Sequence, residues 1–219
     1  MFHAKTSSVL GGGHEAMARL PLTTITFLGM GNTHAQRGSF AALVAAGDAK
    51  DEDWFQALHK SSWLHSLSNI LRGAVAISRH LAAGDPVLVH CSDGWDRTPQ
   101  LVSTAQILMD PFYRTIDGLM VLVEKDWCSF GHQFASRTGF AGSTAAESNA
   151  GEKLISPIFL QWLDALWQIM QQFPHSFEYN EELLLFLQRC TYDRWWGNML
   201  HDCDADRAAA FAASLAAMP

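Results

Sequence analysis

A cysteine and an arginine separated by five residues, Cys91 and Arg97, carry the clearest chemical signal in the sequence. They follow the short apolar run 87–89, and Pro99 opens a helical pattern directly after them. A loop that leads into a helix directs several backbone N–H groups at one point, beside the positive end of the helix dipole. A thiol held there has a lowered pKa and is a good nucleophile. The spacing therefore predicts a phosphate-binding loop with a reactive cysteine.

The residues of this loop suit the transfer of a phosphoryl group. The thiolate of Cys91 can attack phosphorus and form a covalent phospho-enzyme. Arg97 offers a planar fork that binds two phosphate oxygens, and Thr98 can donate a hydrogen bond to the sulfur. The leaving alkoxide needs a proton donor, and the loop contains two carboxylates, Asp93 and Asp96. The residues alone leave the choice between these two open.

The surroundings of the loop distinguish it from a chance spacing. An ordinary buried cysteine beside a surface arginine would explain Cys91 and Arg97 if they stood alone. Gly94 allows a close approach of the backbone to a ligand, and Pro99 suits the first turn of a helix, where a missing N–H costs little. With the preceding apolar run, these residues favour the catalytic interpretation.

The elements that must position the loop are mostly helical. Residues 22–28 alternate like a strand, and residues 87–89 read as a short buried strand. Apolar residues recur at helical spacing over longer stretches: 54–83, 115–125, 157–173 and 180–190. The pattern predicts a mainly helical domain built around a small buried sheet.

Composition narrows the classes of function. With 219 residues, a hydrophobic fraction of 48% and a charged fraction of 17%, the chain predicts one globular domain. The net charge of −7 argues against nucleic acid as a partner. The four cysteines stand far apart and fit reduced thiols of a cytoplasmic protein, and the histidines show no metal-ligand spacing. We therefore expect neither a metal nor another cofactor.

The sequence His90–Thr98, HCSDGWDRT, resembles the signature loop of the myotubularin phosphatases without a mismatch. Further blocks resemble the family in the same order: 11–15, 31–39, 61–78, 113–132 and 156–181. The resemblance implies that residues 1–200 are the C-terminal, active-site portion of a myotubularin-like phosphatase domain whose N-terminal part is missing. Residues 201–219 are expected to be an alanine-rich tail.

The family resemblance also implies a fold and a reaction. The expected fold is a helix-rich α/β domain of the protein-tyrosine-phosphatase type, with a central sheet flanked by helices. The expected reaction is hydrolysis of the 3-phosphate of phosphatidylinositol 3-phosphate, of the 3,5-bisphosphate, or of both, through a cysteinyl-phosphate. Two alternatives remain, namely a catalytically weak or inactive interaction module of the same family, and a protein-tyrosine phosphatase.

Carried over residue by residue, the resemblance assigns roles within the site. The expected catalytic residues are Cys91 as the nucleophile, Asp96 as the preferred general acid and Arg97 as the phosphate ligand. The expected substrate-binding residues are Ser92, Asp93, Gly94, Trp95, Asn32 and Arg137. Gln133 stands where the family pattern has arginine, which leaves the preference among lipids open.

The resemblance further implies a location and partners. The protein is expected in the cytoplasm, on the surface of endosomal-type membranes, where it meets a phosphoinositide lipid. Pairing with a second copy or with a related phosphatase is a further expectation.

Overall fold

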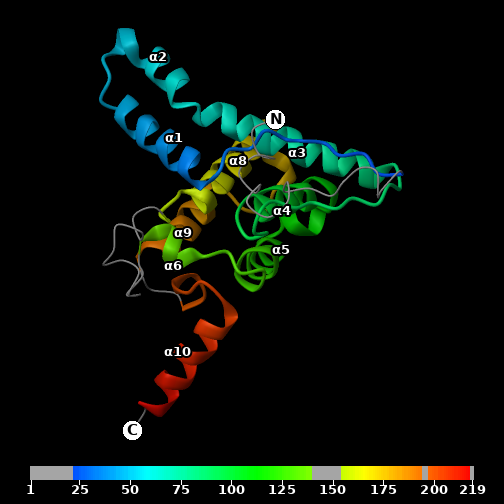
Figure 1. Cartoon of the computed structure of the whole chain (residues 1–219), viewed down its shortest axis with the longest axis vertical. Coiled ribbons are helices and arrows are strands. Elements are labelled where there is room, and N and C mark those ends of the chain that lie inside the picture. The colour runs from blue at the N-terminus through cyan, green and yellow to red at the C-terminus, as the bar shows by residue number, and fades with distance from the viewer. Residues whose placement is uncertain (1–21, 140–153, 194–196, 218–219) are drawn as a thin grey trace.

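The computed structural model describes residues 22–139, 154–193 and 197–217, and every regular element within these ranges is a helix (Figure 1). The α-helices are α1 (Thr33–Ala46), α2 (Asp51–Ser61), α3 (Trp63–Ala82), α4 (Arg97–Met109), α5 (Ile116–Leu122), α6 (Phe134–Thr138), α8 (Ile158–Gln172), α9 (Glu181–Tyr192) and α10 (Asp204–Ala216). A π-helical segment, Val123–Ser129, continues α5. The prediction of an α/β fold with a central sheet is therefore wrong for the described part of the chain.

The two runs expected to be strands explain this error. Residues 22–28 and 87–89 form no ladder of backbone hydrogen bonds within the described ranges. A strand persists only where a neighbour takes up its N–H and C=O groups. Here Val87 and Val89 pack instead against the apolar cluster between α3 and α4, whereas the intervening Leu88 is 86% exposed. The apolar run 87–89 thus belongs to a segment that covers helices.

The long helix expected over residues 54–83 is interrupted at Ser62, which separates α2 from α3. Ser62 has φ of 60°, a left-handed conformation that non-glycine residues rarely adopt. The hydroxyl of Ser61 donates to the carbonyl of Leu58 at 2.6 Å and accepts from the Trp63 N–H at 3.2 Å. These side-chain bonds replace backbone bonds of the helix and explain why the chain turns here.

Other helices agree with the sequence pattern. Helices α8 and α9 fall within about two residues of their expected bounds. The side chain of Asn180 caps α9 by accepting a hydrogen bond from the Glu182 N–H at 3.1 Å, which confirms the expected helix start.

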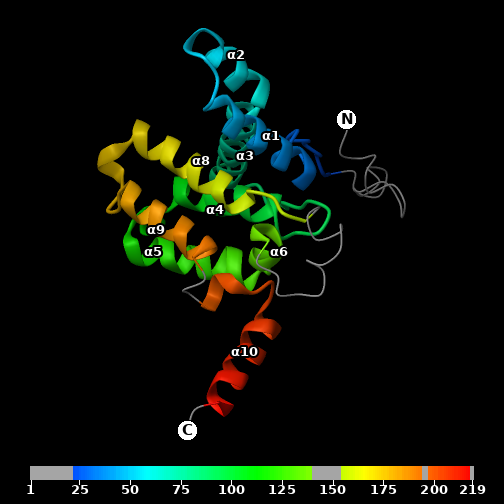
Figure 2. The same cartoon turned by 90° about the vertical axis from the view of Figure 1, so that its left-hand side faces the viewer.

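Two apolar clusters form the core, and α4 and α8 contribute to both. One cluster surrounds Trp127 and Trp162 and includes Ile107 of α4. The other surrounds Ile70 of α3 and includes Leu101 of α4. Figure 2 shows α8, α4, α9 and α5 lying beside one another in the body of the molecule. Because α4 is held by both clusters, its N-terminus, where the cysteine loop ends, has a defined position.

Helix α10 projects away from this body (Figures 1 and 2). It buries none of its residues, and Arg207 anchors its first turns by donating to the carbonyls of Cys128 and Asn198. Within the described residues, no helix is both long and apolar enough to cross a membrane.

Candidate active site

The loop between Cys91 and α4 folds around the cysteine sulfur. The Sγ atom of Cys91 accepts hydrogen bonds from the backbone N–H of Gly94 at 3.2 Å and from the hydroxyl of Thr98 at 3.3 Å. Gly94 has φ of 90°, a conformation that strongly favours glycine, so its place in the loop has a backbone reason. The sulfur therefore lies where backbone donors converge at the start of α4.

These contacts change the acidity of the thiol. Burial acts to raise the pKa of Cys91, but the hydrogen bond from Thr98, the N–H groups of Gly94 and Asp93, and the charge of Arg97 act in the opposite direction. The favourable contacts prevail, and the pKa of Cys91 lies below its ordinary value. The loop thus stabilises the thiolate, which is the nucleophilic form.

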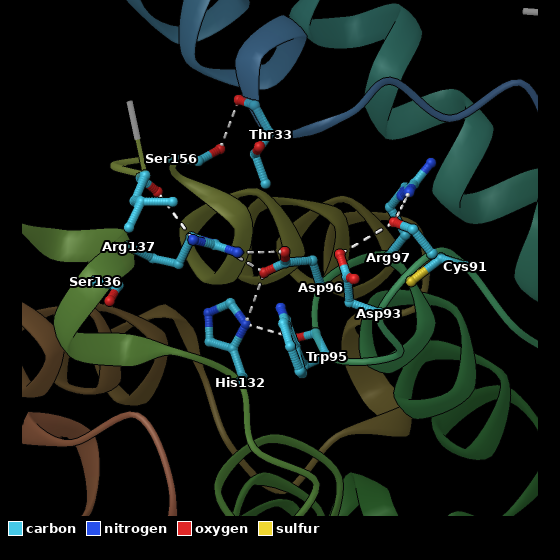
Figure 3. A network of polar contacts seen from close by, with 12 residues as sticks. Thr33, Cys91, Asp93, Trp95, Asp96, Arg97, His132, Ser136, Arg137 and Ser156 are labelled. Carbon is cyan, nitrogen blue, oxygen red and sulfur yellow. Dashed lines mark hydrogen bonds and ion pairs between the residues drawn. The ribbon is translucent and has the colours of Figure 1, made fainter. Parts of the chain in front are cut away.

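Arg97 begins α4 and connects to the other side of the loop. Its Nη2 atom donates to the hydroxyl of Ser92 at 3.0 Å, and that hydroxyl donates to a carboxylate oxygen of Asp93 at 3.2 Å. Ser92 and Asp93 are exposed, whereas Arg97 is half-buried. Figure 3 shows Arg97 and Asp93 beside Cys91. The structure therefore brings the predicted nucleophile and phosphate ligand together on one loop.

Asp96, the other carboxylate of the loop, has different surroundings. It is 7% exposed, and the guanidinium of Arg137 binds it with two hydrogen bonds, Nε to Oδ1 at 3.0 Å and Nη2 to Oδ2 at 2.7 Å. Figure 3 shows the Asp96 carboxylate directed toward Arg137 and away from the thiol of Cys91. Both oxygens of Asp96 are thus engaged by a residue of α6.

The partners of Asp96 hold it in its ionised form. Burial acts to raise the pKa of Asp96, but the hydrogen bonds and positive charges of His132 and Arg137 outweigh burial and lower the pKa to about 2. At neutral pH, this carboxylate is therefore ionised in the described geometry.

His132 joins the loop backbone to this ion pair. Its Nδ1 atom lies 2.7 Å from the carbonyl oxygen of Trp95 and 3.3 Å from Oδ1 of Asp96. Both neighbours are acceptors, so Nδ1 carries a hydrogen. The ring is 1% exposed and meets the rings of Trp127 and Phe134 edge to face, at centroid distances of 4.9 and 4.7 Å. His132 therefore fixes the backbone of the loop at Trp95.

Arg137 also links the loop to the start of α1. Its Nη1 atom donates to the carbonyl of Leu154 at 3.1 Å, and its own carbonyl accepts from the Ser156 N–H at 3.0 Å. The Ser156 hydroxyl then donates to the carbonyl of Thr33 at 3.0 Å (Figure 3). Asn32, beside Thr33, caps α1 by accepting from the Ala35 N–H at 3.0 Å. The predicted ligand residues Arg137 and Asn32 are thus each committed to contacts within the protein.

A buried chain of glutamines, which the sequence did not reveal, ties the same helices together. The amide of Gln161 in α8 donates to Gln36 in α1 at 2.7 Å. Gln100 in α4 donates to Gln161 at 3.1 Å and to the carbonyl of Ile158 at 2.9 Å. The sequence spacing of the three glutamines does not predict their hydrogen bonds, because they belong to three helices that are distant in the sequence.

Two further segments that the sequence singled out are placed as follows. Gln133 is partly buried and immediately precedes α6. The block 11–15 lies outside the described residues.

Comparison with known proteins agrees with the geometry of the loop. Residues 1–208 match the model of the myotubularin-like phosphatase domain. The chain is 43% identical over 200 residues to a human protein named phosphatidylinositol-3,5-bisphosphate 3-phosphatase MTMR4, covering 90% of this chain and 16% of that protein.

Two other relatives show the same similarity. The chain is 42% identical over 209 residues to phosphatidylinositol-3,5-bisphosphate 3-phosphatase mtm-1 of Caenorhabditis elegans, and 38% identical over 208 residues to myotubularin of Xenopus laevis. In each case the match covers 94% of this chain and 34% of the relative. The chain thus spans about a sixth to a third of the length of the curated relatives it matches.

Proposed function

Since this chain belongs to the myotubularin-like phosphatase domain family, we propose that it hydrolyses the 3-phosphate of phosphatidylinositol 3-phosphate, of the 3,5-bisphosphate, or of both. The names of the relatives assign 3-phosphatase activity on the bisphosphate to those longer proteins. This chain retains the cysteine, the arginine and both carboxylates of the signature loop.

The observation that carries the proposal is the environment of the Cys91 sulfur. The Gly94 N–H and the Thr98 hydroxyl both point at Sγ, at 3.2 and 3.3 Å, directly before the N-terminus of α4. The same donors and the helix dipole suit a bound phosphate. A buried structural cysteine would lack this set of donors, and its pKa would rise rather than fall.

The proposed reaction proceeds in two steps through a covalent intermediate. The thiolate of Cys91 attacks phosphorus while the bond between phosphorus and the ring oxygen breaks, and the leaving oxygen takes up a proton. Arg97 stabilises the negative charge on the phosphoryl oxygens. Water then attacks the cysteinyl-phosphate, and the hydrogen bond from Thr98 stabilises the thiolate as it departs.

The two loop carboxylates differ as proton donors. Asp96 has to lose its contacts with His132 and Arg137 before a proton can be held there, because those contacts stabilise the ionised form. Asp93 is exposed, and among the described residues its carboxylate accepts a hydrogen bond from Ser92 and forms no ion pair, so its use as the donor would break none of the ion pairs of that part of the chain. For the geometry described here, we therefore favour Asp93 as the donor over Asp96, the residue preferred from the sequence. In this proposal, Asp96 positions the loop.

The proposed substrate is a lipid, so the reaction takes place at a membrane surface. We propose the cytoplasmic face of endosomal-type membranes and retain pairing with a related phosphatase, both on family resemblance. The remaining loop residues Ser92, Gly94 and Trp95 are proposed to shape the ring pocket. Asn32 and Arg137 would need to exchange an internal contact for a ligand contact, since both are engaged within the protein.

Phosphate release tests the proposal directly. The substrates are phosphatidylinositol 3-phosphate, its 3,5-bisphosphate, the 4-phosphate and a phosphotyrosine peptide, and Cys91→Ser is the control variant. We expect release from the 3-phosphorylated lipids alone, abolished in Cys91→Ser. Release mainly from the peptide would indicate a protein-tyrosine phosphatase. No release by a folded protein would leave the inactive interaction module as the better account.

A further inference from the structure

The C-terminal part of the chain contacts α6, the helix that carries Arg137. The carboxylate of Asp202 accepts two hydrogen bonds from Ser136: Oδ1 from the backbone N–H at 3.0 Å, and Oδ2 from the hydroxyl at 2.6 Å. Asp202 belongs to residues 201–219, the stretch expected from the sequence to be a tail. We propose that Asp202 is a positioning residue of the reactive loop, because it holds the helix from which Arg137 binds Asp96. This inference rests on the proposed phosphatase reaction, in which the reactive loop takes part.

Helix α6 needs this contact because it is short and its own sequence caps it poorly. It has five residues, and Gln133, which precedes it, makes no capping hydrogen bond with its side chain. The first N–H groups of a helix have no acceptor within the helix, and such a short helix is marginal by itself. Asp202 accepts the N–H of Ser136, the third residue of α6, as a capping side chain would, and its negative charge suits a helix start. The start of α6 is thus stabilised by a residue 66 positions further along the chain.

Ser136 and Arg137 are adjacent, so the position of α6 decides where the guanidinium of Arg137 lies. Figure 3 shows Arg137 directed toward Asp96, whereas the Ser136 hydroxyl points away from it. Asp96 in turn lies two residues after Gly94, whose N–H donates to the Cys91 sulfur at 3.2 Å. A shift of α6 would therefore move Asp96 and misalign this donor. The contact at α6 thus reaches the thiol through the ion pair and the loop backbone.

The segment that holds Asp202 is itself fixed to the body of the protein. Before Asp202, the amide of Asn198 donates to the carboxylate of Glu124 at 2.9 Å. After it, Arg207 donates to the carbonyl of Cys128 and to the carbonyl of Asn198, the latter at 3.1 Å. Glu124 and Cys128 both belong to the π-helical segment that continues α5. Asp202 is therefore held against that segment on both sides and can restrain α6 rather than follow it.

Alkylation of Cys91 with iodoacetamide tests the inference in the full chain without a phosphatase assay. We expect Asp202→Ala to move the midpoint of the rate to higher pH and to lower the rate about threefold at a fixed pH below it. Loss of a negative charge alone would lower the pKa of a thiol, so a rise has to come from a loosened loop. An unchanged or lower midpoint in a folded Asp202→Ala protein overturns the proposal and leaves Asp202 a purely structural contact.

Further variants separate the hydrogen bonds of Asp202 from its charge. Asp206→Ala removes the same charge from an exposed residue of α10 and should leave the midpoint unchanged. Asp202→Asn retains a side-chain oxygen for the Ser136 N–H and should keep the midpoint close to that of the wild type. A rise in either variant as large as in Asp202→Ala would contradict the proposal. If Asp202→Ala does not fold, Ser136→Ala, which removes only the hydroxyl bond, replaces it: a midpoint shifted upward supports the proposal, and an unshifted one overturns it.

Steady-state kinetics on the proposed lipid substrates give a second, separate measurement. Asp202→Ala should lower kcat about tenfold or more, because a misplaced loop slows the reaction of bound substrate. KM should change by less than about twofold, since Asp202 contacts no substrate in this proposal. A rise in KM with kcat unchanged would indicate a substrate contact and overturn the positioning role. If the wild type hydrolyses none of the lipids, the proposed function fails, whereas the alkylation midpoints still decide the role of Asp202.

Discussion

Arg137 binds both carboxylate oxygens of Asp96, across 41 residues of sequence, at 3.0 and 2.7 Å. The side chains of Arg137 and Asp96 are 7% and 10% exposed, so the pair is almost fully buried. Asp96 directly precedes α4, and Arg137 belongs to α6. The ion pair therefore joins the end of the reactive loop to a separate helix.

Asp96→Asn should destabilise the protein strongly, because it leaves the guanidinium of Arg137 buried without its counter-charge. Breaking a buried pair by removing one partner costs about 3–5 kcal/mol. Asp93→Asn is the matched control within the same loop, and because Asp93 is exposed, we expect it to cost less than about 0.5 kcal/mol. Denaturant unfolding of both variants measures the difference, and equal costs would contradict a stabilising role for the pair.

The contacts of Asp96 with His132 and Arg137 also make the stability of the protein depend on pH at the acid end. The pKa of Asp96 is about 2 in the folded protein, below the ordinary value of 3.8, so the folded state favours the ionised form. The resulting stability, about 2 kcal/mol, is present above pH 4 and is lost as the pH falls from about 4 toward 2. The difference in unfolding free energy between the wild type and Asp96→Asn should therefore shrink over this range. A constant difference down to pH 2 would show that Asp96 does not titrate in this way.

Leaving-group dependence can identify the proton donor. A phosphoinositide has a poor alkoxide leaving group, whereas p-nitrophenyl phosphate releases a good one that needs no proton. Loss of the donor should slow hydrolysis of the lipid by about 10²–10⁴-fold and leave the aryl phosphate nearly unaffected. We expect this pattern for Asp93→Asn, and a similar loss on both substrates for Asp96→Asn. The opposite assignment of the two patterns would make Asp96 the donor.

Alkylation of Cys91 reports the acidity of its thiol. The rate of reaction with iodoacetamide rises with the fraction of thiolate, so its midpoint should lie below the ordinary pKa of the thiol, about 8.5–9. Thr98→Val removes a hydrogen bond that lowers this pKa, and the midpoint should therefore move to higher pH. Cys91→Ser gives the background from the other cysteines. An unshifted midpoint in Thr98→Val would exclude the hydroxyl as a cause.

Gln133→Arg tests the one departure from the family pattern that bears on selectivity. Gln133 precedes α6, only four residues before Arg137, and it is partly exposed. An added guanidinium there can pair with a second ring phosphate. We expect the ratio of kcat/KM for the 3,5-bisphosphate to that for the 3-phosphate to rise about tenfold. Gln133→Met, which adds no charge, should leave the ratio unchanged.

The sequence was most informative where structure is encoded locally. Cys91, Gly94, Arg97 and Thr98 lie within eight residues, and their spacing predicted a loop before a helix, which the structure shows. The family blocks predicted a myotubularin-like domain, and the comparisons confirm it. The chemical roles of these residues stay predictions until activity is measured.

Contacts between distant segments could not be predicted in the same way. Arg137 was expected to face the ligand, and nothing in the sequence indicates that Asp96 occupies its guanidinium. The sheet was wrongly predicted because a short apolar run such as 87–89 fits a strand and a covering segment equally well. Ser62 gave no signal of its own, because a left-handed serine has no sequence signature.

The sharing of α4 between both apolar clusters has a consequence for the reactive thiol. A residue outside the loop, such as Trp127 or Ile70, still restrains the helix whose N-terminus carries the Thr98 hydroxyl that bonds the sulfur. A substitution that loosens either apolar cluster would therefore disturb the hydrogen-bond geometry around Cys91, even though no loop residue is changed. The pKa of Cys91 thus reports on how well both apolar clusters of the helical body are packed.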